Sequence, residues 1–486
     1  MNQNTIKTFG ELEQSGYTSR TIKDELRKNL IEKIKNKTPF FEGIIGYEDT
    51  VIPQIISAVL SKHDINLLGL RGQAKTRIAR SMVELLDEYI PIIAGSEIND
   101  DPFHPISHFG KSIKAEKGTD MPIQWLHRND RFYEKLATPD VTVADLIGDI
   151  DPIKAATLKL SYADERVIHY GMIPRANRSI FVINEIPDLQ ARIQVALFNI
   201  LQEGDIQIRG FKIRLPLDIN FVFTANPEDY TNRGSIVTPL KDRIGSQILT
   251  HYPKSIEVAK KITQQEVIAE VKNENIHVPE TAKSLLEQIV FEARLSPYID
   301  ANSGVSARMS ISMYENLVSA AELRMLRNGE SKTTIRMSDF EAITPAITGK
   351  VELVYEGEQL GVEKVANLLI GAAIKTTFDE LFRPILKLKK LGVTDEFDSI
   401  VQWFMDENDF ELTNDSTDEN HVKELNKITP LEDALNKFIT NSDEKERVFL
   451  KELMLWGLVE YKQLAKNKRT TGMTFFDEIL GSLYGE

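Results

Sequence analysis

The chain has 486 residues, enough for about three domains with substantial hydrophobic cores. It contains no cysteine, which excludes disulfides, thiolate zinc sites and thiol nucleophiles and makes a reducing cytoplasm the expected location. The formal net charge of −14 argues against general nucleic-acid binding, and neither a secretion signal nor an apolar run of about 20 residues that could span a membrane is expected.

Residues 1–42 are expected to form a helical lead-in that packs on the domain after it. Lys and Arg are interleaved with apolar positions here, and Ser19 or Thr21 can cap the helix. A turn at Ile45 and Gly46 then precedes an apolar-periodic helix. These two residues are candidates for contact with an adenine ring, although taken alone they indicate only a turn marked by glycine.

The stretch that follows has the layout of a phosphate-binding loop. A short apolar strand is predicted at 64–69, a glycine-containing loop follows, and a helix is predicted to end near Tyr89. In such a loop, backbone N–H groups face phosphate oxygens, Lys75 reaches the β- and γ-phosphates, and the Thr76 hydroxyl holds Mg²⁺. Ala74 stands where the pattern has glycine, at a cost of about 1 kcal/mol if the backbone is left-handed. Read alone, Lys75 and Thr76 are an exposed start of a helix. The candidate nucleotide-binding residues of the loop are Gly69, Arg71, Gly72, Gln73, Ala74, Lys75, Thr76 and Arg77.

Two further apolar strands, predicted at 179–185 and 219–227, end in polar residues. Parallel α/β sheets place their chemistry at the carboxyl ends of such strands, so Asn184, Glu185 and Asn226 are candidate site residues. Read alone, Glu185 is a surface acid that caps a helix. Residues 204–215 predict a basic hairpin that turns at Arg209-Gly210. Its basic side chains are more typical of the exposed face of a hairpin than of a nucleic-acid contact.

The remainder of the chain is predicted to be helical. Arg308 opens a long helix, and Ser338 is expected to cap another. From about residue 350 the helical pattern continues, and the acidic stretch from Asp406 to Asn420 is interpreted as a solvated loop. The eight histidines show no metal-ligand spacing.

The order of these features resembles that of an AAA+ ATPase, in the branch of the magnesium-chelatase ATPase subunit and its MoxR relatives. Residues 145–151 and 171–178 are similar to the helix-2 insert of that branch and to the G-x-x-x-R-A-N-R segment before its Walker B strand. The resemblance covers roughly residues 40–345. It implies an α/β fold: a P-loop domain with a parallel sheet and helices on both faces, then a helical lid and a C-terminal helical region. The expected divisions are 1–42, 43–254, 255–349 and 350–486.

The resemblance also implies roles for individual residues. Lys75 and Thr76 are the Walker A pair, and Asn184 and Glu185 take the Walker B positions. Asn226 matches sensor 1, and the hairpin at 204–215 resembles the pre-sensor-1 hairpin. The implied cofactors are ATP and Mg²⁺, with Thr76 and Asn184 at the metal. Arg243 matches an arginine finger that acts on the neighbouring subunit, and Arg308 matches sensor 2.

Two positions, Ala74 and Asn184, depart from the family pattern, and Asn184 is the main departure. Asn184 stands where the family usually has aspartate, and the lost charge costs about 1–3 kcal/mol of Mg²⁺ binding. We favour an ATPase that works in a ring, expected to be a hexamer, and remodels a partner such as a von Willebrand A-domain-type protein; nothing indicates that the chain handles a tetrapyrrole. The alternatives are an ATP-binding switch or scaffold, similar to a transcription regulator, with weak hydrolysis, and a DNA motor.

Overall fold

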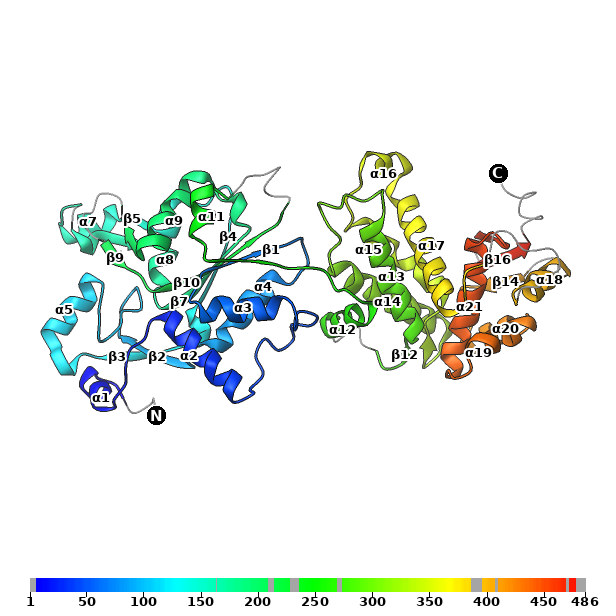
Figure 1. Cartoon of the computed structure of the whole chain (residues 1–486), viewed down its shortest axis with the longest axis horizontal. Coiled ribbons are helices and arrows are strands. Elements are labelled where there is room, and N and C mark those ends of the chain that lie inside the picture. The colour runs from blue at the N-terminus through cyan, green and yellow to red at the C-terminus, as the bar shows by residue number, and fades with distance from the viewer. Residues whose placement is uncertain are drawn as a thin grey trace. The chain divides into compact units, whose positions relative to one another are not determined.

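The structure is a computed structural model that describes residues 6–162, 164–208, 214–227, 236–268, 273–385, 396–406, 410–468 and 472–477. It divides the chain into two compact units, Met1–His251 and Tyr252–Glu486 (Figure 1). The finer division into four parts that the sequence suggests stays a prediction. None of the helices in the described ranges is long and apolar enough to cross a lipid bilayer.

A five-stranded parallel sheet is the centre of the first unit. Its strands are β1 (Ile65–Leu68), β4 (Phe132–Leu136), β7 (Ser179–Asn184), β10 (Ile219–Ala225) and β11 (Ser246–Leu249). Their order across the sheet is β11-β1-β10-β7-β4, and every neighbouring pair is parallel. The register places Leu68 beside Ala225, and Leu136 beside Asn184. The carboxyl ends of β1, β10, β7 and β4 therefore meet at one edge, which confirms the predicted parallel core.

Alternate residues of β7 enter two different hydrophobic cores. Ile180 and Val182 pack with α2 (Ile22–Lys35), α3 (Val51–Leu60) and α4 (Lys75–Ser81). Phe181 and Ile183 pack on the opposite face with α8 (Met172–Arg175), α9 (Ala191–Glu203) and α11 (Thr238–Arg243). This period of two is that of a strand buried on both faces. The sheet thus has helices on both sides, as the fold class predicts (Figure 1).

Smaller elements extend the first unit. They are α1 (Phe9–Gln14), the 3-10 helix η2 (Met82–Leu85), β2 (Tyr89–Ile93), α5 (His108–Lys117), η3 (Gly118–Asp120), β3 (Ile123–His127), η4 (Arg128–Arg131), α6 (Val143–Leu146), β5 (Gly148–Ile150), α7 (Pro152–Leu158), η5 (Glu165–Val167), β6 (Ile168–Tyr170), η6 (Ile186–Asp188), β8 (Asp205–Gln207) and β9 (Arg214–Pro216). The predicted helix end near Tyr89 is wrong, because α4 ends at Ser81 and Tyr89 begins β2, which pairs antiparallel with β3. Strands β8 and β9 form the predicted hairpin, whose turn at Arg209-Gly210 lies outside the described residues.

The lead-in helix α2 is anchored to the sheet by a buried ion pair. The Arg131 guanidinium donates to both carboxylate oxygens of Glu25 at 2.7 Å, and the two side chains are 1% and 5% exposed. Glu25 also accepts from the Asp87 backbone N–H at 2.7 Å, and Arg131 donates to the Arg178 carbonyl at 2.9 Å. These contacts join α2 to three segments of the domain that follows it.

Replacing Arg131 by methionine is expected to lower the free energy of unfolding by about 3–5 kcal/mol, because the Glu25 carboxylate is left buried without its cation. Equilibrium urea unfolding measures the change. Lys28→Ala is the control, since Lys28 is paired with Glu32 at the surface and its loss should change stability by less than about 1 kcal/mol. Equal stability of Arg131→Met and the wild type would contradict the buried pair.

The second unit has one hydrophobic core, which extends from Ile276 to Phe475. Its helices are α12 (Ile256–Glu266), α13 (Glu280–Leu295), α14 (Arg308–Asn328), η8 (Met337–Ile343), α15 (Thr344–Thr348), α16 (Tyr355–Leu360), α17 (Val362–Leu381), α18 (Asp398–Asp406), α19 (Asp418–Leu425), α20 (Pro430–Phe438) and α21 (Glu444–Glu460). Its strands are β12 (Ile276–His277), β13 (Thr333–Thr334), β14 (Phe410–Thr413), β15 (Leu464–Lys468) and β16 (Gly472–Asp477).

The C-terminal region is mainly helical, as expected, and it also contains a small antiparallel sheet of β14, β16 and β15. One expectation for the helices of this unit is wrong. The helix expected to be capped by Ser338 is the 3-10 helix η8, which starts one residue earlier. There the Asp339 carboxylate, and not a Ser338 hydroxyl, accepts from the Arg336 backbone N–H at 2.8 Å.

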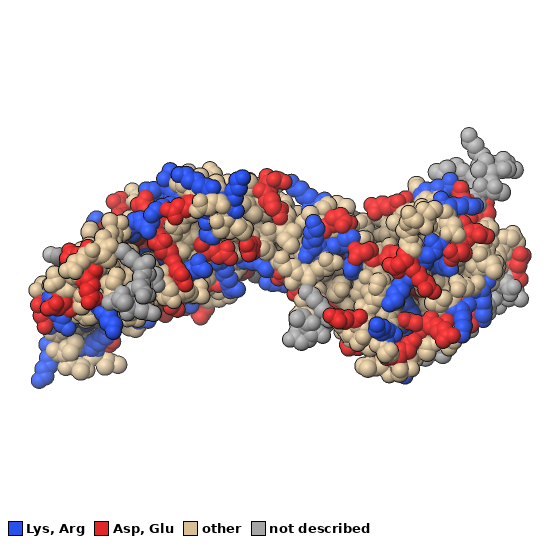
Figure 2. Space-filling model, turned by 90° about the horizontal axis from the view of Figure 1, so that it is seen from below, with Lys and Arg blue, Asp and Glu red and all other residues tan. Residues whose placement is uncertain are grey.

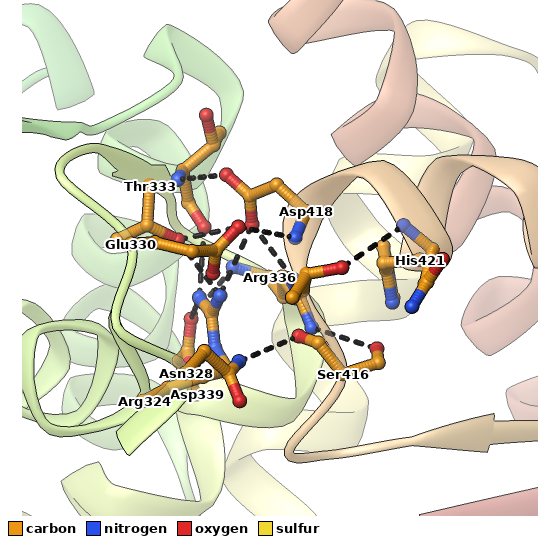
Figure 3. Close-up of polar contacts among 12 residues, drawn as sticks. Arg324, Asn328, Glu330, Thr333, Arg336, Asp339, Ser416, Asp418 and His421 are labelled. Atoms are coloured by element: carbon orange, nitrogen blue, oxygen red, sulfur yellow. Dashed lines mark hydrogen bonds and ion pairs between the residues drawn. The ribbon is translucent and has the colours of Figure 1, made fainter. Parts of the chain in front are cut away.

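Part of the acidic stretch from Asp406 to Asn420 is bound and not solvated. Asp418 accepts from Arg336 at 2.7 Å and from Arg324 at 3.2 Å, and both arginine side chains are at most 4% exposed (Figure 3). Burial raises the pKa of Asp418, but the hydrogen bond and charge of Arg336 outweigh burial and hold that pKa below its ordinary value. The interpretation of this stretch as a solvated loop is therefore wrong at Asp418.

Candidate functional site

The loop between β1 and α4 has a backbone that requires small residues. A Cβ added to Gly69 would lie 1.9 Å from Thr250 Oγ1 and 2.2 Å from Gln73 Oε1, so glycine is needed for this close approach. Ala74 has φ 55° and ψ 18°, in the left-handed region. The expected strain of about 1 kcal/mol at Ala74 therefore applies.

Lys75 joins the loop to the end of a neighbouring strand. Its ammonium donates to the Leu70 carbonyl at 2.9 Å, to the Gly69 carbonyl, and to Asn226 Oδ1 at 2.7 Å. Asn226 directly follows β10, which pairs with β1. Two residues that the sequence places 151 positions apart are thus in contact.

A chain of polar contacts leads from Thr76 to a residue that the sequence analysis missed. The Thr76 and Thr224 hydroxyls donate to Asn184 Oδ1 at 3.5 and 3.1 Å. The Asn184 amide donates to Glu134 Oε1 at 2.6 Å, and Arg80 donates to Glu134 Oε2 at 2.8 and 2.9 Å. Glu134 lies on β4, at the edge of the sheet. A possible sequence signal for Glu134 is a carboxylate within a short strand that is expected to pair with the strand ending in Asn184-Glu185.

Glu185 is held in an uncommon backbone conformation. It directly follows β7 with φ 56° and ψ 48°, and its backbone N–H donates to the Thr224 hydroxyl at 3.1 Å. A left-handed non-glycine residue costs about 1–3 kcal/mol, and such residues cluster at functional sites. The side chain is half-buried at the carboxyl edge of the sheet, next to Asn184. This strain is an observation, independent of sequence pattern, that favours a functional role for Glu185.

The turn at Ile45 and Gly46 is fixed to the loop by Tyr47, which the sequence analysis missed. The buried Tyr47 hydroxyl lies 3.0 Å from the Gln73 carbonyl oxygen and 2.7 Å from the His251 carbonyl oxygen. Gly46 has φ 83°, as expected of a glycine turn. The turn and the loop are therefore connected, while contact of Ile45 and Gly46 with an adenine ring stays a prediction.

The roles expected of Arg243 and Arg308 at the nucleotide stay predictions. Arg243, at the end of α11, donates to Gln202 Oε1 at 2.7 and 2.9 Å and to the Pro239 carbonyl at 2.6 Å, and it lies over the Phe198 ring. Arg308 is exposed at the start of α14 in the second unit. Arg243 is therefore bound by residues of α9 and α11 of the same chain.

The Thr76 hydroxyl and Asn184 Oδ1 lie 3.5 Å apart, and the Glu134 carboxylate contacts the other end of the Asn184 amide. These oxygen atoms fit a hard cation such as Mg²⁺, which usually keeps several waters and is bound by one or two carboxylates together with substrate phosphates. Within the described ranges, no group of three or more His, Asp or Glu side chains is arranged to hold a metal ion. These oxygen atoms therefore suit a cation that is bound together with a phosphate ligand. They suit a cation bound by the protein alone less well.

Comparison with known proteins agrees with this geometry. Residues 122–244 match the family described as "AAA domain (dynein-related subfamily)", a segment that includes Asn184, Glu185, Asn226 and Arg243 but not the loop at 69–77. The fold and the matched segment thus define an AAA domain in this chain.

Similar curated proteins belong to one group. The chain is 25% identical over 230 residues to "Magnesium-chelatase subunit ChlI-1, chloroplastic" of Arabidopsis thaliana, a match covering 46% of this chain and 51% of that protein. It is 26% identical over 231 residues to the "Magnesium-chelatase 38 kDa subunit" of Cereibacter sphaeroides, covering 46% and 61%. The chain is a distant relative of these magnesium-chelatase subunits and spans between about half and three fifths of their length.

Among solved structures, the chain is similar to a model of the complex between subunits BchI and BchD of magnesium chelatase. The identity is 18%, the coverage is 65% of this chain and 97% of that chain, and the TM-score is 0.33.

Proposed function

We propose that this chain binds ATP with Mg²⁺ at the loop 69–76 and hydrolyses it in an oligomeric ring that remodels or activates a partner protein. One observation supports the site most directly. Lys75 contacts Asn226, Thr76 contacts Asn184, and the strained Glu185 follows Asn184. A loop cation, a loop hydroxyl and the polar ends of two strands thus meet at one sheet edge, which is where phosphoryl transfer requires them.

The residues divide the chemistry among them. Lys75 exchanges its carbonyl acceptors for the β- and γ-phosphate oxygens, whose charge it balances. Glu185 accepts a hydrogen bond from the attacking water and orients it in line with the γ-phosphorus. Asn226 lies against Lys75 and can donate from its amide to the γ-phosphate or the water. Mg²⁺, when bound, neutralises charge that develops on the phosphates.

A ring of several copies is proposed from the role that the resemblance gives to Arg243. Its guanidinium is held by Gln202 on the surface of α9 and α11. In the proposed ring this surface faces the nucleotide site of the neighbouring subunit, so that hydrolysis depends on contact between subunits. A hexamer and a partner of the von Willebrand A-domain type are proposed from the resemblance to chelatase and MoxR-type ATPases.

Charge distribution bears on the DNA-motor alternative. Figure 2 shows Lys and Arg side chains interspersed with Asp and Glu side chains over the described residues of the face in view. Nucleic-acid binding relies on a stripe or patch of positive charge, which this face does not present among those residues. The ATP-binding switch is distinguished from the ATPase by turnover alone, since both need the same nucleotide site.

Replacing Lys75 by alanine is expected to weaken ATP binding by about tenfold or more, because a charge-assisted contact worth about 1.5–3 kcal/mol is lost. Fluorescence anisotropy with a labelled ATP analogue measures the affinity, and phosphate release measures turnover. Lys111→Ala is the control, since Lys111 is exposed on α5 and should leave both unchanged. Equal affinity of Lys75→Ala and the wild type would overturn the nucleotide site, whereas binding without turnover in the wild type would favour the switch.

A further inference from the structure

Asn184 creates a deficit of charge at the proposed metal position. Asn184 is 8% exposed, and its amide accepts from the Thr76 and Thr224 hydroxyls through Oδ1. A neutral oxygen there attracts a divalent cation less strongly than a carboxylate does. The charge that would compensate has to come from another residue close to Asn184.

Glu134 is the carboxylate that contacts Asn184. Its Oε1 accepts from the Asn184 amide at 2.6 Å, which is a short, charge-assisted hydrogen bond. This bond fixes the orientation of the amide, because Nδ2 faces Glu134 and Oδ1 is left to face Thr76. The register of β4 and β7 places Leu136 beside Asn184, so Glu134 belongs to the same end of the sheet as the loop.

Arg80 does not cancel this carboxylate. Both of its hydrogen bonds, at 2.8 and 2.9 Å, go to Oε2, so Oε1 is left for Asn184. The Arg80 side chain is 63% exposed, whereas that of Glu134 is 24% exposed. Because the Arg80 head group is exposed, water screens its charge, so Arg80 weakens the field of Glu134 at Asn184 without abolishing it.

We propose that Glu134 supplies the negative charge of the divalent-cation site in place of the carboxylate that is missing at position 184. Glu134 is a positioning residue: it orients the Asn184 carbonyl toward Thr76 and adds one negative charge at the nitrogen end of that amide. Outer-shell carboxylates of this kind typically change metal affinity by about 10–100-fold. The inference rests on the proposed nucleotide site.

The test measures cation affinity and not catalysis. Mn²⁺ is titrated into the full chain saturated with ADP, and free Mn²⁺ is followed by electron paramagnetic resonance. Glu134→Gln is expected to weaken Mn²⁺ binding by about 10–100-fold. The double variant Glu134→Gln, Asn184→Asp should recover most of this loss, because it returns a carboxylate to the site. A residue that only maintains structure would not be rescued by a carboxylate at 184.

Two further variants complete the experiment. Asp164→Asn is the matched control, since Asp164 is 26% exposed, is paired with Arg166, and should leave Mn²⁺ affinity unchanged. Arg80→Gln keeps Glu134 but removes its counter-charge, so Mn²⁺ should bind about 2–5-fold more tightly. Because Arg80 is exposed, this variant tests the proposal even if Glu134→Gln does not fold.

The outcomes separate the inference from the proposed function. ADP affinity in excess EDTA is measured first, and a wild type that does not bind ADP overturns the proposed function. If ADP binds and Glu134→Gln holds Mn²⁺ within twofold of the wild type, the role of Glu134 is overturned. The role of Glu134 is also overturned if Glu134→Gln weakens Mn²⁺ binding and the double variant does not restore it. It is likewise overturned if Arg80→Gln binds Mn²⁺ as tightly as the wild type or more weakly.

Discussion

Replacing Glu185 by glutamine is expected to lower the rate of ATP hydrolysis by about 10²–10⁴-fold and to leave ATP affinity nearly unchanged. Glutamine has the same shape but cannot take a proton from the attacking water. The left-handed backbone at position 185 disfavours both side chains equally, and the Thr224 contact is made by the backbone N–H. The loss should therefore be confined to chemistry, with phosphate release and labelled-ATP anisotropy as the two measurements.

A control in the same unit is provided by Glu203, an exposed residue at the end of α9. Glu203→Gln removes one carboxylate from the unit without altering the strand ends, so both rate and affinity should match the wild type. If Glu185→Gln retains the wild-type rate, Glu185 is not the base. The strain at this position would then belong to the turn into η6 and not to catalysis.

The strands that build the site could be predicted because they are short apolar runs. Residues 65–68, 179–184 and 219–225 are strands, as expected, and their parallel register explains why Lys75 meets Asn226. A single apolar run identifies such a strand without knowledge of its neighbours. This part of the candidate site therefore followed from local pattern together with the rule that polar strand ends share one edge.

The features that could not be predicted from the sequence depend on contacts between residues that are far apart in the chain. Glu134 sits in an edge strand of mixed polarity and matters only because Asn184 is beside it. Asp418 looks like one more solvated acid until Arg324 and Arg336, 94 and 82 positions earlier, are placed next to it. The C-terminal strands β14 to β16 were missed for the same reason, since a short strand is stabilised by its partners more than by its own composition.

Replacing Arg243 by alanine is expected to lower the rate of ATP hydrolysis by about 10³–10⁵-fold, the range found for arginine fingers that stabilise a phosphoryl-transfer transition state. ATP affinity should not fall in parallel, because the contacts of Arg243 in its own chain are with Gln202, Pro239 and Phe198 and not with the loop. Arg192→Ala, which removes an exposed arginine from α9, is the control and should retain the wild-type rate.

Mixing two inactive variants distinguishes action between subunits from action within one chain. A subunit with Glu185→Gln still carries Arg243, and a subunit with Arg243→Ala still carries Glu185. Where the first lies beside the second in a ring, one complete site is formed at their junction. Mixed rings should therefore recover a measurable part of the wild-type rate, whereas either variant alone should not. If mixing restores nothing while mass measurements show that the variants assemble together, Arg243 acts in its own chain, and hydrolysis is not coupled to contact between subunits in the way proposed.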